Sequence, residues 1–291
     1  MSLSQVPWQV LVVTSSLVTS LSIVVNKHQS HKASALQVQS LKYLSASVFI
    51  GLVWWFISKN IPLAWWQFYI YGMAVGINVT IYTQAQRISL SKTALVGPIG
   101  ELLGVILAAI VLKEWRLFTS SRGLYLILAL ILMPAVFWFF YEVKEISSKK
   151  WIKTIAVFLS ILAVFKVITK TLLDKAPEAI EMLMFLYFGA FTATFIGLKI
   201  KRYKMFVNKR FAIKGILQGI IAGSGTLLIF AAIKQATVVQ TTLLRVPLLL
   251  IVTTLSGLIG FKELEKMNAK KWIGTIVAGL IMILVLLSTQ Q

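Results

Sequence analysis

Ten apolar segments of about 20 residues, separated by short polar stretches, constrain this sequence most. A helix of about 20 apolar residues is long enough to cross roughly 30 Å of hydrocarbon. Helices satisfy their own backbone hydrogen bonds in a bilayer, and the segments lack the alternating pattern of membrane β-strands. We therefore predict an all-α membrane protein with ten transmembrane helices. The predicted spans are approximately 8–25, 38–58, 64–83, 93–112, 122–141, 151–170, 178–198, 212–233, 237–260 and 272–288.

The composition excludes a disordered chain and argues against a soluble domain. Hydrophobic residues make up 58% of the chain and charged residues 13%, whereas a soluble domain carries about 25% charged residues. The chain has no cysteine, which excludes disulfide scaffolds, cysteine-ligated metal sites and thiol catalysis. The first segment lacks the basic start and the cleavage site of a signal peptide, so we expect it to remain as a helix.

Two stretches of the sequence share features at the same spacing. Pro98 is followed 16 residues later by Glu114, and Pro247 is followed 16 residues later by Glu263. Each glutamate comes directly after a lysine and precedes a short polar loop and a further apolar segment. The chain therefore divides into two five-span halves, 1–145 and 146–291. An odd number of spans gives the halves opposite orientations, and such inverted repeats are typical of secondary transporters.

These repeated blocks make the chain similar to the drug/metabolite transporter superfamily, specifically to its EamA-like ten-helix members. The resemblance covers essentially the whole chain, although Lys-Glu replaces the usual Gly-Glu after spans four and nine. It implies a permease in the cell membrane, with helices around a central cavity that closes alternately to either side. The residues that carry it are Lys27, Lys42, Pro98, Lys113-Glu114, Gly123, Pro247, Lys262-Glu263 and Trp272-Ile273-Gly274.

Leaving aside the first and last four residues of each predicted span, four charged residues fall inside the spans, where a central charge costs about 2.5–3.5 kcal/mol on insertion scales. They are Glu101, Lys166, Arg245 and Lys42. In one interpretation, Glu101 forms a buried ion pair with Lys166 or Arg245 and fixes the interface between the halves. In the other, Glu101 takes up a proton during transport while one of the bases attracts an anionic group of the substrate. Lys42 and Arg245 lie near span ends, so snorkelling to the surface is a further alternative.

Polar residues and prolines within spans are further candidates. Asn78, Tyr82 and Ser224 are predicted either to hydrogen-bond between helices or to line the substrate cavity. Pro98 and Pro247 are predicted hinges, unless they merely occupy the first helical turns. Small residues at four-residue spacing predict close helix packing in three spans. They are Gly72 and Gly76, then Gly100, Gly104 and Ala108, then Gly215, Gly219 and Gly223.

The positive charge is unevenly distributed. Of the 29 Lys and Arg residues, 3 lie within spans, 19 on one side and 7 on the other. The positive-inside rule places the 19-base side in the cytoplasm and both termini outside, whereas many members of the resembled family have both termini inside. We expect the basic loop 199–214 to contact anionic lipid headgroups rather than nucleic acid. The acidic residues in loops and at helix ends, Glu181 among them, are expected to be solvated.

Several chemistries have no motif in this sequence. Neither a Walker A loop nor a dinucleotide fingerprint is present, so we expect no cofactor and no ATP-driven pump. His28 and His31 have no acidic neighbour, which argues against a metal site, and no catalytic set suggests an enzyme. The sequence favours a secondary transporter of small polar metabolites, driven by a gradient or by exchange, acting as a monomer or homodimer. The excess of intramembrane bases favours anionic substrates. A membrane channel and a non-transporting membrane sensor are the alternatives.

Overall fold

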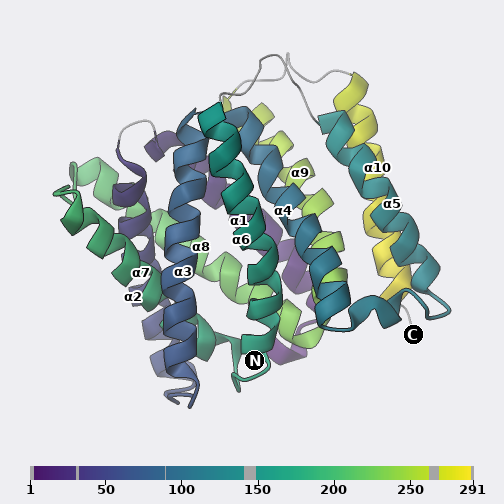
Figure 1. The fold of residues 1–291 in the computed structure, drawn as a ribbon, viewed down its shortest axis with the longest axis horizontal. Coiled ribbons are helices and arrows are strands. Elements are labelled where there is room, and N and C mark those ends of the chain that lie inside the picture. Colours follow the sequence, from purple (N-terminus) through teal and green to yellow (C-terminus); the bar gives the residue numbers. More distant parts are fainter. Residues whose placement is uncertain (1–2, 31–32, 89, 141–148, 262–268, 290–291) are drawn as a thin grey trace.

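The computed structural model describes residues 3–30, 33–88, 90–140, 149–261 and 269–289 (Figure 1). Within these ranges the chain is all-helical, with ten α-helices, two short 3₁₀ helices and no β-strand. The ten helices lie at the predicted positions, which confirms the helical class. The α-helices are α1 (Trp8–Ser30), α2 (Ala35–Ile57), α3 (Trp65–Ile88), α4 (Leu90–Val111), α5 (Gly123–Phe140), α6 (Lys149–Leu173), α7 (Ala179–Ile200), α8 (Lys209–Gln235), α9 (Val238–Phe261) and α10 (Ala269–Thr289), and the 3₁₀ helices are η1 (Leu3–Gln5) and η2 (Glu114–Leu117).

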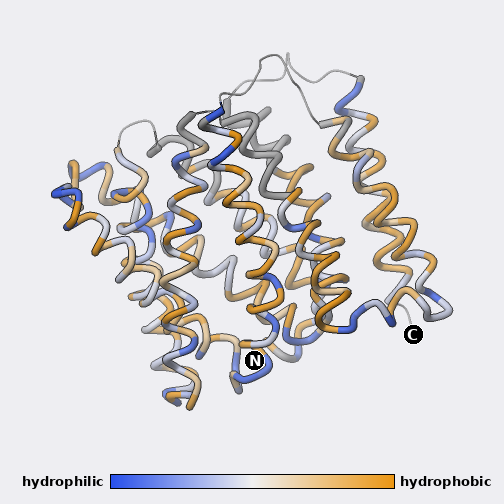
Figure 2. The backbone as a smooth tube through the Cα atoms, in the orientation of Figure 1, coloured by the Kyte–Doolittle hydropathy of each residue, from blue (hydrophilic) through white to orange (hydrophobic). Residues whose placement is uncertain are grey.

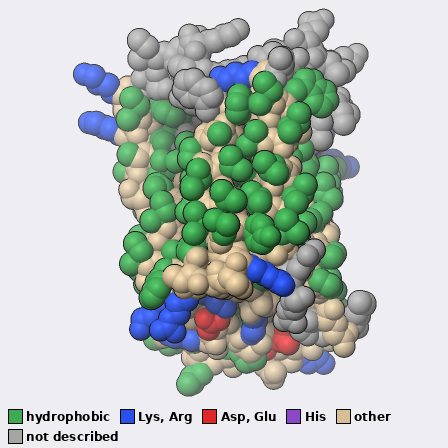
Figure 3. Space-filling model, turned by 90° about the vertical axis from the view of Figure 1, so that its right-hand side faces the viewer, with side chains coloured by type: hydrophobic (Ala, Val, Ile, Leu, Met, Phe, Trp, Pro, Cys, Tyr) green, Lys and Arg blue, Asp and Glu red, His purple; other side chains and the backbone are tan. Residues whose placement is uncertain are grey.

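Five helices are long and apolar enough to cross a membrane, namely α2, α6, α7, α8 and α10. Shorter apolar stretches occupy α1, α4, α5 and α9. Apolar residues run along the helices while polar residues gather toward the turns (Figure 2). A broad belt of hydrophobic side chains covers one side of the molecule, with charged side chains below it (Figure 3). These features indicate an integral membrane protein.

The two halves of the chain pack against each other through most of their helices. Helix α3 packs on α7, and α8 packs on α2. Helix α1 contacts α8 and α9, while α6 contacts α3 and α4. Helices α2 and α7, α4 and α9, and α5 and α10 also meet as pairs. The interface between halves 1–145 and 146–291 is therefore the main packing surface of the molecule.

Glycines bring the interfacial helices into close contact. A Cβ added to Gly72 on α3 would lie 2.1 Å from the carbonyl oxygen of Leu186 on α7. A Cβ added to Gly219 on α8 would lie 2.5 Å from the carbonyl oxygen of Lys42 on α2. Neither position accommodates a larger residue without moving a backbone, so the prediction of close packing at these stripes is confirmed.

The helix ends follow from local sequence. Ser34 and Gln37 form a capping box at the start of α2, and the Asn208 side chain caps α8. At the opposite ends of three helices, the second residue beyond the helix is a basic residue in the left-handed conformation, where a cation suits the helix dipole. Such residues follow α2, α4 and α7, and they are Lys59, Lys113 and Arg202.

Both ends of the chain lie on the same side of the bundle (Figure 1). The Gln9 side-chain amide near the start of α1 donates to Thr289 Oγ1 at the end of α10, at 3.4 Å. The Gln235 amide at the end of α8 donates to the carbonyl oxygen of Leu3 at 2.9 Å. These two contacts hold the described start and end of the chain on one side of the bundle.

Candidate functional site

A carboxylate and two cationic side chains from three helices meet inside the bundle. Glu101 of α4 lies between Lys166 of α6 and Arg245 of α9. Lys166 Nζ is 3.3 Å from Glu101 Oε2, and Arg245 Nη1 donates to Glu101 Oε1 at 3.1 Å. The side chains are only 15%, 11% and 14% exposed, in the order Glu101, Lys166, Arg245. We call these three residues the charged triad. They come from both halves of the chain.

A glycine makes room for one arm of the triad. Gly104 lies one turn after Glu101 on the face of α4 that meets α6. A Cβ at Gly104 would lie 2.6 Å from Lys166 Cγ. The bare backbone at this position therefore lets the Lys166 side chain pass over α4 and reach the carboxylate. This explains in part why a small-residue stripe lies next to the acidic residue in this helix.

The triad is not fully satisfied by its own members. One negative charge faces two positive charges, so the cluster has a formal excess of one positive charge. Among the described residues, Arg245 Nε is buried without a hydrogen-bond partner, and Glu101 Oε2 has Lys166 at ion-pair distance but lacks a bond of hydrogen-bond geometry. A buried donor of this kind normally finds a partner. The cluster thus has both the charge and the free donor to accept an anionic group.

Sequence analysis offered Lys166 or Arg245 as alternative partners of Glu101, and the structure brings both to it. Because Arg245 reaches Glu101 and is 14% exposed, the snorkelling alternative is wrong for this residue. Lys42 does not join the triad. Its ammonium lies 5.0 Å from the ring centroid of Tyr43, a cation–π distance.

The three polar candidates in the spans have different surroundings. Asn78 on α3 is 2% exposed, and its Oδ1 has no hydrogen-bond partner in the described part of the chain. The Tyr82 ring stacks on Phe158 of α6, with centroids 4.5 Å apart. The Ser224 hydroxyl donates to the carbonyl oxygen of Ile220 in its own helix at 3.0 Å. Tyr82 therefore contributes an interhelical contact, while the hydroxyl of Ser224 bonds within α8.

One predicted hinge lies beside the triad. Pro247 is inside α9, two residues after Arg245, and it is buried. The alternative that Pro247 occupies the first helical turn is therefore wrong. Because proline has no backbone N–H, Pro247 removes the helical hydrogen bond to the carbonyl of Leu243. Helix α4 continues through position 98, but the side chain of Pro98 lies outside the described residues. A further helix proline that sequence analysis did not consider, Pro134, lies inside α5.

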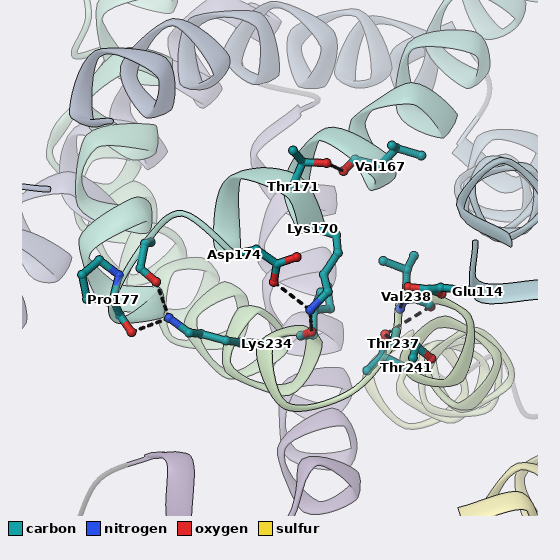
Figure 4. Close-up of polar contacts among 12 residues, drawn as sticks. Glu114, Val167, Lys170, Thr171, Asp174, Pro177, Lys234, Thr237, Val238 and Thr241 are labelled. Atoms are coloured by element: carbon teal, nitrogen blue, oxygen red, sulfur yellow. Dashed lines mark hydrogen bonds and ion pairs between the residues drawn. The ribbon is translucent and has the colours of Figure 1, made fainter. Parts of the chain in front are cut away.

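Glu114 has a role that the repeat alone did not reveal. It begins η2 after α4 and is buried, and one carboxylate oxygen accepts the backbone N–H of Val238 at 3.1 Å (Figure 4). The other accepts the backbone N–H of Val239 at 2.9 Å. A carboxylate at this position satisfies free N–H groups and suits the positive end of the α9 dipole. The first half thus caps a helix of the second. Glu263, its match in the repeat, lies outside the described residues.

Two lysines tie the turn after α6 to the end of α8 (Figure 4). Lys170 Nζ donates to the carbonyl oxygen of Ile233 at 3.2 Å and pairs with Asp174 at 2.9 Å. Lys234 donates to the carbonyl oxygens of Pro177 and of the residue before it. We call this reciprocal arrangement the lysine clasp. It holds the ends of α6 and α8 together on the side of the bundle where the chain begins and ends.

The expectation that Glu181 is solvated is wrong. Its side chain is fully buried in the first turn of α7, where it accepts a hydrogen bond from Ser58 Oγ at 2.5 Å and one from the backbone N–H of Glu178 at 3.4 Å. The spacing of Glu178 and Glu181 is that of a capping box. That local signal was available in the sequence, whereas the contact with the end of α2 depends on the packing of α7.

Comparison with known proteins establishes the fold and not the family. No protein-family model and no curated protein sequence matches this chain. Among solved structures, one described only as "Crystal structure of protein" superposes with a TM-score of 0.73. It has 10% sequence identity, and the match covers 98% of this chain and 99% of the other. The whole ten-helix arrangement therefore occurs in a protein of known structure.

Proposed function

We propose that this protein is a secondary transporter that moves small polar metabolites across the cell membrane. It is a multi-pass permease of the EamA-like type, with ten membrane-spanning helices in two inverted repeats. The observation that carries this proposal is the charged triad of Glu101, Lys166 and Arg245, whose side chains are at most 15% exposed where α4, α6 and α9 meet. Ionisable residues within a membrane bundle are expensive, and they commonly mark substrate or ion pathways.

The triad favours an anionic substrate. The excess positive charge and the unpartnered Arg245 Nε suit a carboxylate or phosphate group. A substrate anion at Arg245 competes with Glu101 for the guanidinium. Glu101 then keeps Lys166 as its partner or takes up a proton, which couples substrate binding to a gradient. Since Arg245 and Pro247 lie within one turn, loss of the contact with Glu101 frees α9 at the point where its hydrogen-bond ladder is already interrupted.

The packing of the helices supports two repeats. We match each helix of the first half with the helix five places later in the second half. This matching turns the pair α3 and α7 into the pair α8 and α2, and both pairs are in contact. It likewise turns α1 and α9 into α6 and α4, which also contact each other. The pairs α2–α7, α4–α9 and α5–α10 map onto themselves. Contacts that are preserved when the halves are exchanged are expected for halves related by a pseudo-twofold axis. Rocking one half against the other is the usual route to alternating access.

The experiment starts from a thermal-shift screen of the purified protein against amino acids, sugar phosphates, nucleotides and amphipathic cations. Uptake of the stabilising compound is then measured in proteoliposomes with and without a pH gradient. We expect uptake that saturates with concentration and that falls at least tenfold in Arg245→Ala.

The controls separate the alternatives. Lys59→Ala alters a base at the end of α2, away from the triad, and should transport normally. Flux that does not saturate would indicate a channel, and ligand binding without any flux would indicate a sensor. Unchanged uptake of an anionic substrate by Arg245→Ala would remove the triad from the mechanism.

A further inference from the structure

A basic cavity lies at the end of α7, on the opposite side of the bundle from the lysine clasp. Its volume is about 560 Å³. Its wall includes three basic and three aromatic side chains from the end of α7 and the turn that leads to α8. They are Lys199, Arg202, Lys204, Phe195, Tyr203 and Phe206.

Hydrogen bonds fix the backbone that carries these bases. The N–H of Arg202 donates to the carbonyl oxygen of Lys199 at 3.1 Å, and the N–H of Tyr203 donates to that of Leu198 at 3.0 Å. The Gln37 side-chain amide on α2 donates to the carbonyl oxygen of Lys204 at 2.7 Å. The turn is therefore anchored at both ends, so the three bases are presented around one cavity.

In the part of the chain that the structure describes, no ion pair compensates the charge of this cavity. None of the ion pairs between described residues involves Lys199, Arg202 or Lys204. Lys199 Nζ lies 5.3 Å from the centroid of the Phe195 ring, which leaves its N–H donors available. Three cations around one cavity with aromatic walls suit an anion that carries an apolar part.

The surroundings of the cavity point to a lipid. The turn connects α7 and α8, which are both long and apolar enough to cross a membrane. Ile200 is 73% exposed, Tyr203 48% and Phe206 54%. Exposed apolar and aromatic side chains beside bases, at the end of a spanning helix, are typical of the interfacial layer. A small soluble anion would make no favourable contact with these apolar side chains.

We propose that this cavity binds the phosphate headgroup of an anionic phospholipid from the leaflet that meets the α7–α8 turn. Arg202 and Lys204 hold the phosphate oxygens, Lys199 adds the third charge, and the aromatic side chains contact the glycerol and the upper acyl chains. The site is distinct from the charged triad, and the inference does not rest on the transport function.

The test counts bound lipids by native mass spectrometry after titration with phosphatidylglycerol or phosphatidylcholine. Each Lys or Arg near an anionic surface contributes about fivefold in affinity. The variant Lys199→Gln/Arg202→Gln/Lys204→Gln should therefore lose phosphatidylglycerol affinity on the order of 100-fold. The matched control Lys209→Gln/Arg210→Gln/Lys214→Gln removes the same charge from the exposed start of α8 and should retain it.

A single substitution separates binding from folding. Arg202 has a φ of 55°, a conformation that glycine adopts without strain. Arg202→Gly should therefore keep or raise the thermal stability of the lipid-free protein, and it should bind phosphatidylglycerol about fivefold more weakly.

The outcomes distinguish a site from diffuse attraction. Equal losses in the cavity variant and the control would mean that the basic turn acts only through its overall charge, and this would overturn the proposal. Unchanged binding by the cavity variant would overturn it as well. Thermal stabilisation by inorganic phosphate as large as that by phosphatidylglycerol would replace the lipid with a soluble anion.

Discussion

Replacing Glu101 with glutamine tests the charged triad directly. The change keeps the shape of the side chain and removes the charge that Lys166 and Arg245 share. At the observed separations of 3.3 and 3.1 Å, each attraction is about 5 kcal/mol for an effective dielectric constant near 20. Desolvation and the repulsion between the two bases offset part of this. Since the substitution leaves two buried cations without a counter-ion, we expect a loss of about 3–5 kcal/mol in the free energy of unfolding.

The assay is reversible unfolding in mixed micelles with a rising fraction of SDS, followed by tryptophan fluorescence. Lys166→Met should be milder than Glu101→Gln because Glu101 keeps Arg245 as a partner. The matched control is Asp174→Asn, which breaks an ion pair whose carboxylate is 56% exposed and should cost at most about 1 kcal/mol. If Glu101→Gln destabilises the protein no more than Asp174→Asn does, the triad does not hold the halves together.

Four further substitutions, one of them a control, test contacts in the same unfolding assay. Glu114→Gln should lower the free energy of unfolding by about 1–2 kcal/mol because it weakens the cap of α9, and no loss would mean that solvent replaces the carboxylate. Gly72→Ala should cost about 1–3 kcal/mol because its Cβ would overlap a backbone carbonyl of α7. Gly51→Ala, where the added Cβ meets nothing within 4 Å, should instead stabilise the protein by up to about 1 kcal/mol. Lys234→Met should cost about 1–3 kcal/mol, since the carbonyls it caps lose their donor, and equal stability would rule out a structural role for the lysine clasp.

The number and positions of the helices could be predicted from hydropathy, because each helix contains one continuous apolar segment. A buried pair between Glu101 and a basic residue of another span could be predicted almost as directly. A charge in an apolar helix needs a partner, and the spans contain only a few opposite charges. The choice between Lys166 and Arg245 did not follow from the sequence, since it depends on which helices adjoin α4. In the structure, α4 lies against both α6 and α9, so both bases reach Glu101.

Contacts at the helix ends were harder to predict. Glu114 and Glu181 are acidic residues near turns, which usually remain in water. Their burial depends on the first turn of α9 and on the end of α2, which come from distant parts of the sequence. The repeat marked Glu114 as unusual without indicating its partner. For Ser224, sequence analysis weighed bonds between helices and cavity lining, whereas the hydroxyl bonds within its own helix, which is a common arrangement for serine in apolar helices.

The cap that Glu114 places on α9 has a consequence for assembly. Two backbone donors at the start of the ninth helix have their acceptors on a turn that is synthesised more than a hundred residues earlier. If the halves were produced as two separate polypeptides, the two backbone donors at the start of α9 would remain unsatisfied until the N-terminal polypeptide docked. Completion of the second half therefore depends on the prior presence of the first, and the order of synthesis along the chain provides it.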